Sequence, residues 1–181
     1  MEPGHALVVG FGNELRGDDG VGQVVAEAVW SRRHGVPALA GAAFIWCAQL
    51  LPEVALDLSG ASFAVFVDAA CDGSAPGSVH LRRLDHEVAG KDRVGQVAGA
   101  WGCWVDLSPT ALLSLSAQLF GAAPPAVLVT VSVDAPMTWV GLSPVISAAV
   151  PAAVGAVERA IASWQDGSEP VTRESGRVLR A

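Results

Sequence analysis

The chain has 181 residues, the length of one domain, and 51% of them are hydrophobic while 16% are charged. A packed core is therefore expected, and disorder is excluded for most of the length. The formal net charge of −7 argues against a nucleic acid or an anionic membrane as a partner, because both require a positive surface. Three widely spaced cysteines without a Cys-x-x-Cys pair fit a reducing cytoplasm better than a disulfide framework or a zinc finger.

Two apolar runs raise the question of a membrane, since the mean hydropathy is +0.43. The uncharged run from Leu107 to Val133 is long enough to span, but Gly121–Pro125 divides it into pieces that are each too short. The run from Ala135 to Val157 contains three prolines and mostly small residues. We therefore expect a buried helix of a soluble protein and no membrane insertion. Met1–His5 carries an acid and no Lys or Arg, so it is not a signal peptide.

The first half of the chain alternates apolar runs with helical patterns. Its expected elements, in chain order, are a strand at Ala6–Gly10, a helix at Gly20–Trp30, a weak strand at Ala38–Ala43, a helix at Gln49–Leu58 and a strand at Phe63–Asp68. The first strand is apolar without alternation, which is typical of a strand covered on both faces. Gly35-Val36-Pro37 is expected to end the first helix.

The second half continues the alternation. Its expected elements are a short strand at Ser78–Leu84, a long loop at 85–105, a helix at Ser108–Phe120, a strand at Ala126–Val133 and a last helix from Ser143 to about Trp164. Both helices open with Ser-Pro, in which Ser is the N-cap and Pro the first helical residue. The pattern predicts an α/β fold: one domain, residues 1–164, forming a three-layer sandwich with a mostly parallel twisted sheet and helices on both faces. Residues 165–181 are expected to form a flexible tail.

Asp18 and Asp19 follow a loop that opens like a nucleotide-binding loop. The pattern fails, because the residue three positions after Gly12 is Leu15 and an Asp pair would repel a pyrophosphate. No nucleotide is therefore expected. One aspartate could cap the following helix and contribute about 1 kcal/mol. Capping leaves the second aspartate unexplained, and Glu14 adds a third carboxylate to the same loop.

Asp68 ends the clearest strand. Ligands of parallel sheets bind beyond the carboxyl ends of the strands, and the loop of Asp18 and Asp19 follows another such end. Carboxylates that converge there repel one another unless a cation or a shared proton joins them. We therefore favour a metal site; the alternative for Asp68 is a carboxylate bonded to loop N–H groups. The four histidines lack the spacing of a preassembled zinc site: His5, His34, His80 and His86.

Three stretches together resemble the maturation endopeptidases of [NiFe]-hydrogenases, which process the C-terminus of the hydrogenase large subunit. Proteins of that family open with a strand, then Gly-x-Gly-Asn-x-Leu-x-x-Asp-Asp/Glu-Gly-x-Gly, then a helix, and Gly10–Gly22 matches throughout. Their strand-end Asp before a Pro-Gly turn is similar to Asp68–Ala70 and Pro76-Gly77 here. Their Gly-Leu-Ser/Thr-Pro before the last helix is similar to Gly141–Pro144. The resemblance extends from about residue 6 to residue 164.

The resemblance implies a divalent metal held by three side chains. The second acid of the loop pair maps to Asp19 and the strand-end acid to Asp68, with Asp18 and Glu14 as secondary candidates. The family's third ligand is a histidine just before a helix, and Val105 occupies that position here.

This loss changes the expected chemistry, because imidazole suits nickel whereas carboxylates alone favour harder ions such as Mg, Ca or Mn. We therefore hypothesise a weaker or differently tuned metal site. Cys103, Asp106, His80 and His86 are the candidates to replace the imidazole.

By resemblance, the chain is a cytoplasmic, monomeric endopeptidase. Its substrate is the [NiFe]-hydrogenase large-subunit precursor, from which it removes a C-terminal extension after nickel insertion. Nickel is then borne by the substrate or bound transiently. Either a carboxylate acts as general base on water, or a metal polarises the scissile carbonyl or activates water; Asp19 and Asp68 are the catalytic candidates. Two alternatives stay open: a degenerate member that binds the precursor or another partner without cutting it, and a small-molecule-binding α/β domain.

Overall fold

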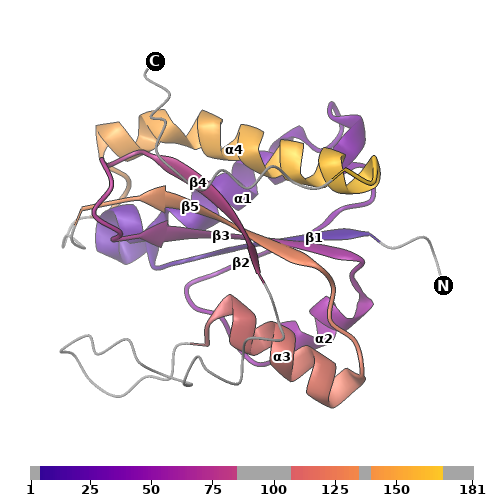
Figure 1. Ribbon diagram of the computed structural model, residues 1–181. Coiled ribbons are helices and arrows are strands. Elements are labelled where there is room, and N and C mark those ends of the chain that lie inside the picture. Colours follow the sequence, from indigo (N-terminus) through magenta and orange to yellow (C-terminus); the bar gives the residue numbers. More distant parts are fainter. Residues whose placement is uncertain (1–4, 85–106, 135–139, 169–181) are drawn as a thin grey trace.

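The computed structural model describes residues 5–84, 107–134 and 140–168. Within them a five-stranded sheet lies between two layers of helices (Figure 1). The strands are β1 (Ala6–Phe11), β2 (Ala43–Cys47), β3 (Phe63–Ala70), β4 (Val79–Leu84) and β5 (Ala126–Ser132). The helices are α1 (Val21–Arg32), α2 (Val54–Gly60), α3 (Pro109–Phe120) and α4 (Pro144–Gln165), with 3-10 turns η1 (Glu14–Gly20) and η2 (Pro37–Leu39).

The strand order is β2-β1-β3-β5-β4. The first four strands in this order run parallel to one another, and β4 pairs with β5 in the antiparallel sense. The predicted α/β class, with a mostly parallel sheet and helices on both faces, is therefore confirmed. Because four strands point the same way, their carboxyl ends meet at one edge of the sheet, which we call the carboxyl edge.

Two apolar cores lie on the two faces of the sheet. Along β3, Val65 and Val67 point to one face, where they pack with α1 and α4. Ala64 and Phe66 point to the other face, where they pack with α2 and α3. All four side chains are completely buried, which explains why this strand is a continuous apolar run and not an alternating one.

The two Ser-Pro helix starts are confirmed. The hydroxyl oxygen of Ser108 accepts a hydrogen bond from the backbone N–H of Ala111, and that of Ser143 accepts one from Ile146. In both helices Pro occupies the first turn, where its missing N–H costs nothing because that donor has no partner inside the helix.

Two boundaries in the first half of the chain were predicted wrongly. The second strand does not lie at Ala38–Ala43 but begins at Ala43, because Pro37 starts the 3-10 turn η2 and sets its first φ angle. The second helix begins at Val54 and not at Gln49, because Pro52 and Glu53 form a turn. In both cases a turn at a proline delays the start of the element beyond the position that the apolar pattern predicts.

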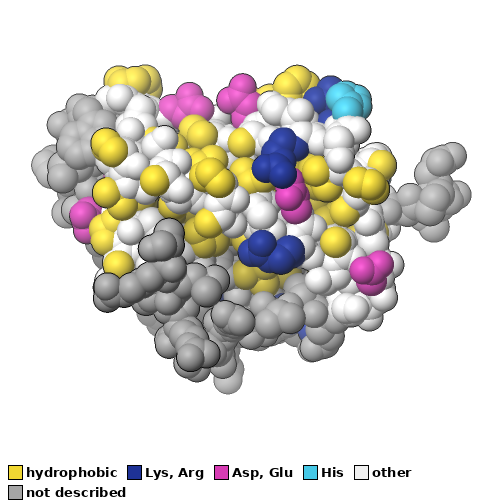
Figure 2. Space-filling model, turned by 90° about the horizontal axis from the view of Figure 1, so that it is seen from above, with side chains coloured by type: hydrophobic (Ala, Val, Ile, Leu, Met, Phe, Trp, Pro, Cys, Tyr) yellow, Lys and Arg dark blue, Asp and Glu magenta, His cyan; other side chains and the backbone are white. Residues whose placement is uncertain are grey.

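Helix α4 is, among the described residues, the one helix long and apolar enough to cross a membrane by length and composition alone. The core helices of soluble proteins pass the same test. Its buried side chains, such as Ile146, Val157 and Ile161, face the sheet. On the face seen in Figure 2, acidic and basic side chains stand among the apolar ones.

Two predicted segments lie outside the described residues. They are the whole of the loop expected at 85–105, and residues 169–181 of the expected tail. Within the described part, α4 extends to Gln165, so the first residue assigned to the tail belongs to the helix. The division into a domain at 1–164 and a tail at 165–181 stays a prediction.

Candidate functional site at the carboxyl edge

The loop after β1 places Asp18 and Asp19 at the carboxyl edge. Asp19 Oδ2 accepts a hydrogen bond of 3.0 Å from the backbone N–H of Asn13. The Asn13 side chain accepts one of 2.9 Å from the N–H of Leu15. Asp18 Oδ1 accepts one of 2.6 Å from the N–H of Ser143. Both aspartates are half-buried, and among the described residues neither forms an ion pair.

The structure contradicts the capping alternative for this pair. The N-cap residue of α1 is Gly20, and no side chain caps that helix. Asp18 instead binds the N-terminus of α4, where its negative charge lies at the positive end of the helix dipole. The positions of Asp18 and Asp19 are thus explained by two different contacts, and neither of them is the one expected from the sequence.

The glycines of the motif allow α1 to lie directly on the strands. A Cβ at Gly22 would overlap the carbonyl oxygens of Phe11, the last residue of β1, and Val67 of β3. Gly12 has a φ of +129°, and a Cβ there would overlap the carbonyl oxygen of Asp19. The Gly-x-Gly pattern therefore serves close backbone packing, and it brings the loop of Asp19 to the end of β3.

Asp68 does not end its strand, as predicted from the sequence, because β3 continues to Ala70 through pairing with β5. Asp68 lies two residues before that end, and η1 is in contact with this strand. Asp19 and Asp68 therefore share the carboxyl edge, as the sequence predicted; their role stays a prediction. Asp68 Oδ1 accepts a hydrogen bond of 2.8 Å from the N–H of Ala69. Because Ala69 belongs to β3, this is not the bond to loop N–H groups that the alternative for Asp68 described. Glu14 is exposed in η1 and belongs to the same loop.

A polar row lies on the sheet face that carries α2 and α3. Asp68 pairs with Thr130 of β5, and Thr130 pairs with His80 of β4. Directly paired residues project to the same side of a sheet, and the alternation along β3 and β5 puts this row on the side of Phe66 and Leu128. His80, a candidate for the missing imidazole, is therefore two strands away from Asp68.

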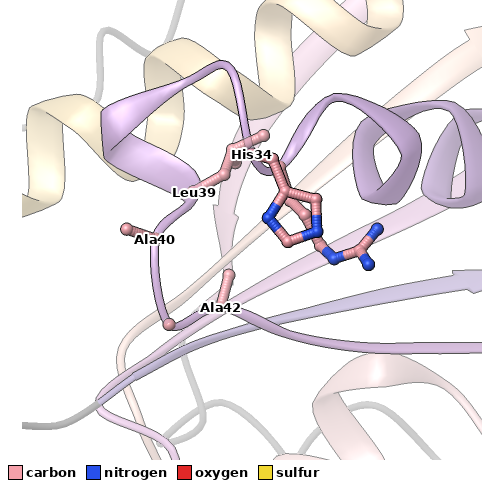
Figure 3. A pocket seen from close by; sticks show the side chains of 6 residues that line it. His34, Leu39, Ala40 and Ala42 are labelled. Atoms are coloured by element: carbon pink, nitrogen blue, oxygen red, sulfur yellow. The ribbon is translucent and has the colours of Figure 1, made fainter.

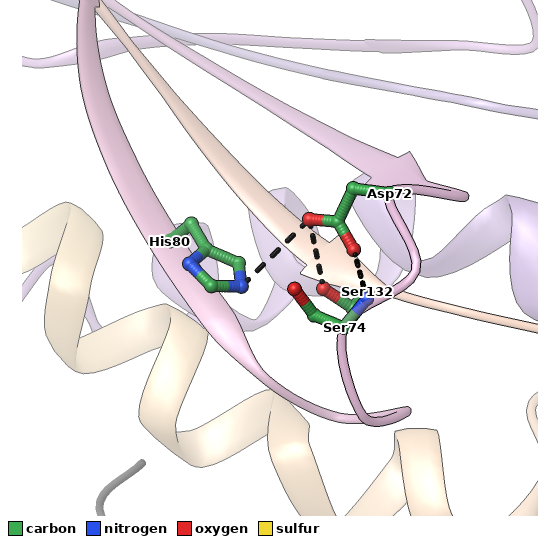
Figure 4. A network of polar contacts seen from close by, with 4 residues as sticks. All are labelled: Asp72, Ser74, His80 and Ser132. Atoms are coloured by element: carbon green, nitrogen blue, oxygen red, sulfur yellow. Dashed lines mark hydrogen bonds and ion pairs between the residues drawn. The ribbon is translucent and has the colours of Figure 1, made fainter. Parts of the chain in front are cut away.

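Asp72 forms a group of contacts that no pattern in the sequence predicts (Figure 4). Asp72 Oδ1 accepts a hydrogen bond of 2.9 Å from the N–H of Ser74, and Oδ2 accepts one of 3.2 Å from the hydroxyl of the fully buried Ser132. His80 Nε2 lies 3.7 Å from Asp72 Oδ2. No sequence motif predicts this cluster, because its residues come together only when β3, β5 and β4 pair in the sheet.

These contacts lower the pKa of Asp72 below its ordinary value of 3.8. The hydrogen bond from the Ser74 backbone contributes most, and the Ser132 hydroxyl and the charge of His80 act in the same direction. Burial raises the pKa of the Cys47 thiol above 9.0, so Cys47 is not an activated nucleophile. Cys71 is exposed, and its thiol lies 3.6 Å from the carbonyl oxygen of Asp134.

The described residues do not by themselves fit a resident metal ion. Among residues 5–84, 107–134 and 140–168, no group of three or more His, Cys, Asp or Glu side chains is placed to hold one. One oxygen of Asp19 already accepts a backbone hydrogen bond. The position of the expected third ligand, Val105, lies outside the described residues, as do Cys103, Asp106 and His86.

The sequence matches no protein-family profile and no curated protein. Its fold, by contrast, is that of the [NiFe]-hydrogenase maturation proteases, which confirms the resemblance drawn from the motifs.

Three solved structures illustrate the likeness. Hydrogenase maturating endopeptidase HybD from E. coli has 22% identity and a TM-score of 0.64 over 91% of this chain and 95% of its own. The hydrogenase 2 maturation peptidase of a Thaumarchaeota archaeon has 25% identity and a TM-score of 0.60, and the match covers 87% of this chain and 97% of the peptidase. The protease HycI from Thermococcus kodakarensis has 18% identity and a TM-score of 0.62, and the match covers 87% of this chain and 92% of HycI.

Proposed function

We propose that this chain is an endopeptidase that removes the C-terminal extension from the precursor of a [NiFe]-hydrogenase large subunit after nickel insertion. The observation that carries the proposal is the fold shared with HybD over 91% of the chain, combined with the acidic motif at its carboxyl edge. The reaction takes place in the cytoplasm, and the enzyme acts as a monomer on the precursor.

Nickel enters as part of the substrate in this proposal. Asp19 and Asp68 meet the nickel-bearing end of the precursor, because Asp19 follows β1 and Asp68 lies near the carboxyl end of the neighbouring strand β3. Carboxylate oxygens can bind a cation or accept a proton from water. Asp18 and Glu14 support the loop: Asp18 ties it to α4, and Glu14 adds negative charge.

The test is cleavage of a nickel-loaded precursor, followed by its change in length on a gel or by mass spectrometry. The wild type is expected to shorten the precursor. Asp19→Asn and Asp68→Asn are expected to lower the rate by at least about 100-fold, the effect of removing an essential acid or base. Asn is used because its amide oxygen can still accept the hydrogen bonds that Asp19 and Asp68 accept now.

The control variant is Asp57→Asn, which removes an exposed acid on α2 and is expected to leave the rate unchanged. Cleavage at the wild-type rate by both site variants would refute the assigned role of Asp19 and Asp68. A precursor left intact by the wild type, beside an active control protease, would refute the endopeptidase proposal.

A second candidate is a relative that binds the precursor without cutting it. It is favoured by Val105, which stands where the resemblance places a metal-binding histidine. This candidate predicts a stable complex between the wild-type chain and an intact, nickel-loaded precursor in size-exclusion chromatography. An endopeptidase would release a shortened subunit instead.

A further inference from the structure

The outer edge of β2 offers backbone groups for pairing. Within the described residues β2 is the last strand on its side of the sheet. The carbonyl oxygen of Cys47 accepts a hydrogen bond of 3.2 Å from the N–H of Gly12 and therefore points toward the β1 side. Backbone groups of successive strand residues point to opposite sides. The N–H and C=O groups of Phe44 and Trp46 thus point outward, where an extended peptide can pair with them.

Large side chains lie along this edge on the α1 side. The rings of Trp46 and Trp30 meet edge to face with centroids 6.0 Å apart, and the guanidinium of Arg33 lies 4.0 Å from the Trp30 ring centroid. The two tryptophans remain 42% and 38% exposed. Exposed tryptophan and arginine are the residues most enriched where proteins bind partners. We call Trp46, Trp30, Arg33 and His34 the β2 strip.

The strip ends in a pocket of about 420 Å³ between the end of α1 and the loop that leads into β2. Arg33 and His34 line it together with Leu39 to Ala42, and Figure 3 shows the imidazole of His34 facing this loop. Arg33 donates one hydrogen bond to the carbonyl of Trp30, and a guanidinium has five N–H donors. The pocket therefore presents positive charge on a chain whose net charge is −7.

We propose that the β2 edge binds the C-terminal extension of the precursor as an added antiparallel strand, with its terminal carboxylate in the pocket at Arg33 and His34. This inference rests on the proposed function. In the proposed function the bond to be cut lies at the carboxyl edge. The part of the precursor that follows this bond must therefore run away from the carboxyl edge, which is antiparallel to the direction of β2. A peptide's last residue carries a carboxylate, a group that an arginine can bind through two parallel hydrogen bonds.

The geometry favours β2 over the other edge strand. β2 is directly beside β1, whereas β5 lies between β3 and β4. β2 has five residues, or about 17 Å at ~3.4 Å per residue. To reach the outer side of β2 from the acids at the carboxyl edge, the extension must also cross β1 and β2, which requires roughly another 10 Å at ~4.8 Å per strand. The extension must therefore contain at least about eight residues to reach the pocket.

The test measures binding of a synthetic peptide with the sequence of the host's large-subunit extension, made with a free carboxylate or as the C-terminal amide. The wild type is expected to bind the amide about fivefold more weakly, the effect of losing one exposed ion pair. Arg33→Gln with His34→Gln is expected to bind both forms equally weakly. The control, Arg82→Gln on β4, removes an exposed arginine from the opposite edge strand and is expected to behave as the wild type.

The backbone pairing is tested by comparing Trp46→Ala with Trp46→Pro. Both remove the ring, but Pro also removes the outward N–H, so it is expected to bind about fivefold more weakly still. Proline is tolerated at such an edge position, and circular dichroism checks the fold. If Trp46→Pro does not fold, the Arg33 and His34 variants decide the result, since they leave β2 unchanged.

Equal affinity of the wild type for both peptide forms would overturn the proposal, as would an equal loss in Arg82→Gln. The proposal would also be overturned if the wild type sedimented as a dimer and the Trp46→Pro variant as a monomer. That result would show that a second copy of the chain occupies the edge of β2. Asp19→Asn is expected to bind the peptide normally. If the wild type binds the peptide in a carboxylate-dependent way but does not cleave the precursor, the endopeptidase proposal is refuted and the proposal for the β2 edge is not.

Discussion

Asp72 shows how a single side chain depends on three strands. It follows β3, accepts a hydrogen bond from Ser132 at the end of β5, and lies near His80 at the start of β4. Ser132 is completely buried, so without Asp72 its hydroxyl would lose the hydrogen bond it makes now, which is costly in a buried position. The carboxylate therefore joins the ends of three strands beside the carboxyl edge.

The lowered pKa of Asp72 predicts a pH dependence. A carboxyl group whose folded pKa lies below its unfolded value of 3.8 stabilises the fold above that value, and the stabilisation is lost as pH falls through the folded pKa. Urea unfolding at about pH 6 and about pH 3 is therefore expected to show a free-energy difference between wild type and Asp72→Asn that shrinks at the lower pH. A difference of the same size at both pH values would contradict this assignment.

At the scale of elements, the packing of α1 on the sheet decides where the acidic loop lies. Gly10 of β1 faces Gly22 and Ala26 of α1 so closely that a Cβ at position 10 would overlap the carbonyl oxygen of Gly22. Because helix and strand approach each other backbone to backbone, η1, which connects β1 to α1, lies in contact with β3. The spacing of the motif glycines is thus a packing requirement.

Gly22→Ala tests this packing. The added methyl group would overlap the carbonyl oxygens of Phe11 and Val67, so we expect the free energy of unfolding to fall by about 1–3 kcal/mol or more. The matched control is Gly60→Ala at the end of α2, where a Cβ would have no neighbour within 4 Å and a change within about 0.5 kcal/mol is expected. Equal stability of the two variants in urea unfolding would refute the packing role.

At the scale of the whole molecule, α4 is attached to the rest of the protein at both ends. Asp18 binds the N–H of Ser143, which is 125 residues away in sequence. At the other end, the ring of Trp164 stacks on Phe63 with centroids 5.3 Å apart, and Gln165 donates a hydrogen bond to the carbonyl of Ala38. These contacts hold the last helix across the length of the sheet (Figure 1).

Asp18→Ala is expected to lower the free energy of unfolding by about 1.5–3 kcal/mol, because a hydrogen bond to a charged group is lost between distant parts of the chain. Asp18→Asn keeps an acceptor oxygen and is expected to lose less. Chemical denaturation of the three proteins at neutral pH measures both changes. Should Asp18→Ala be as stable as the wild type, the contact with Ser143 would not be what holds α4 to the acidic loop.

Much of the fold could be predicted from the sequence, since its signals are local. The continuous apolar run at Phe63 predicts a buried strand, and Ser108-Pro109 and Ser143-Pro144 predict the starts of α3 and α4, which the structure confirms. The starts of β2 and α2 were missed, because turns at Pro37 and Pro52 displace them from the apolar pattern.

For the site, the sequence by itself determined which acids lie near the carboxyl ends of strands: Asp19 after β1, and Asp68 two residues before the end of β3. What those side chains bind was decided by the tertiary structure. Asp18 binds Ser143 and not the helix that follows it, and Asp72 meets His80 through strand pairing that no motif encodes. The physical reason is that strand ends follow from local patterns along the chain, whereas a hydrogen-bond partner depends on which elements the cores bring together in space.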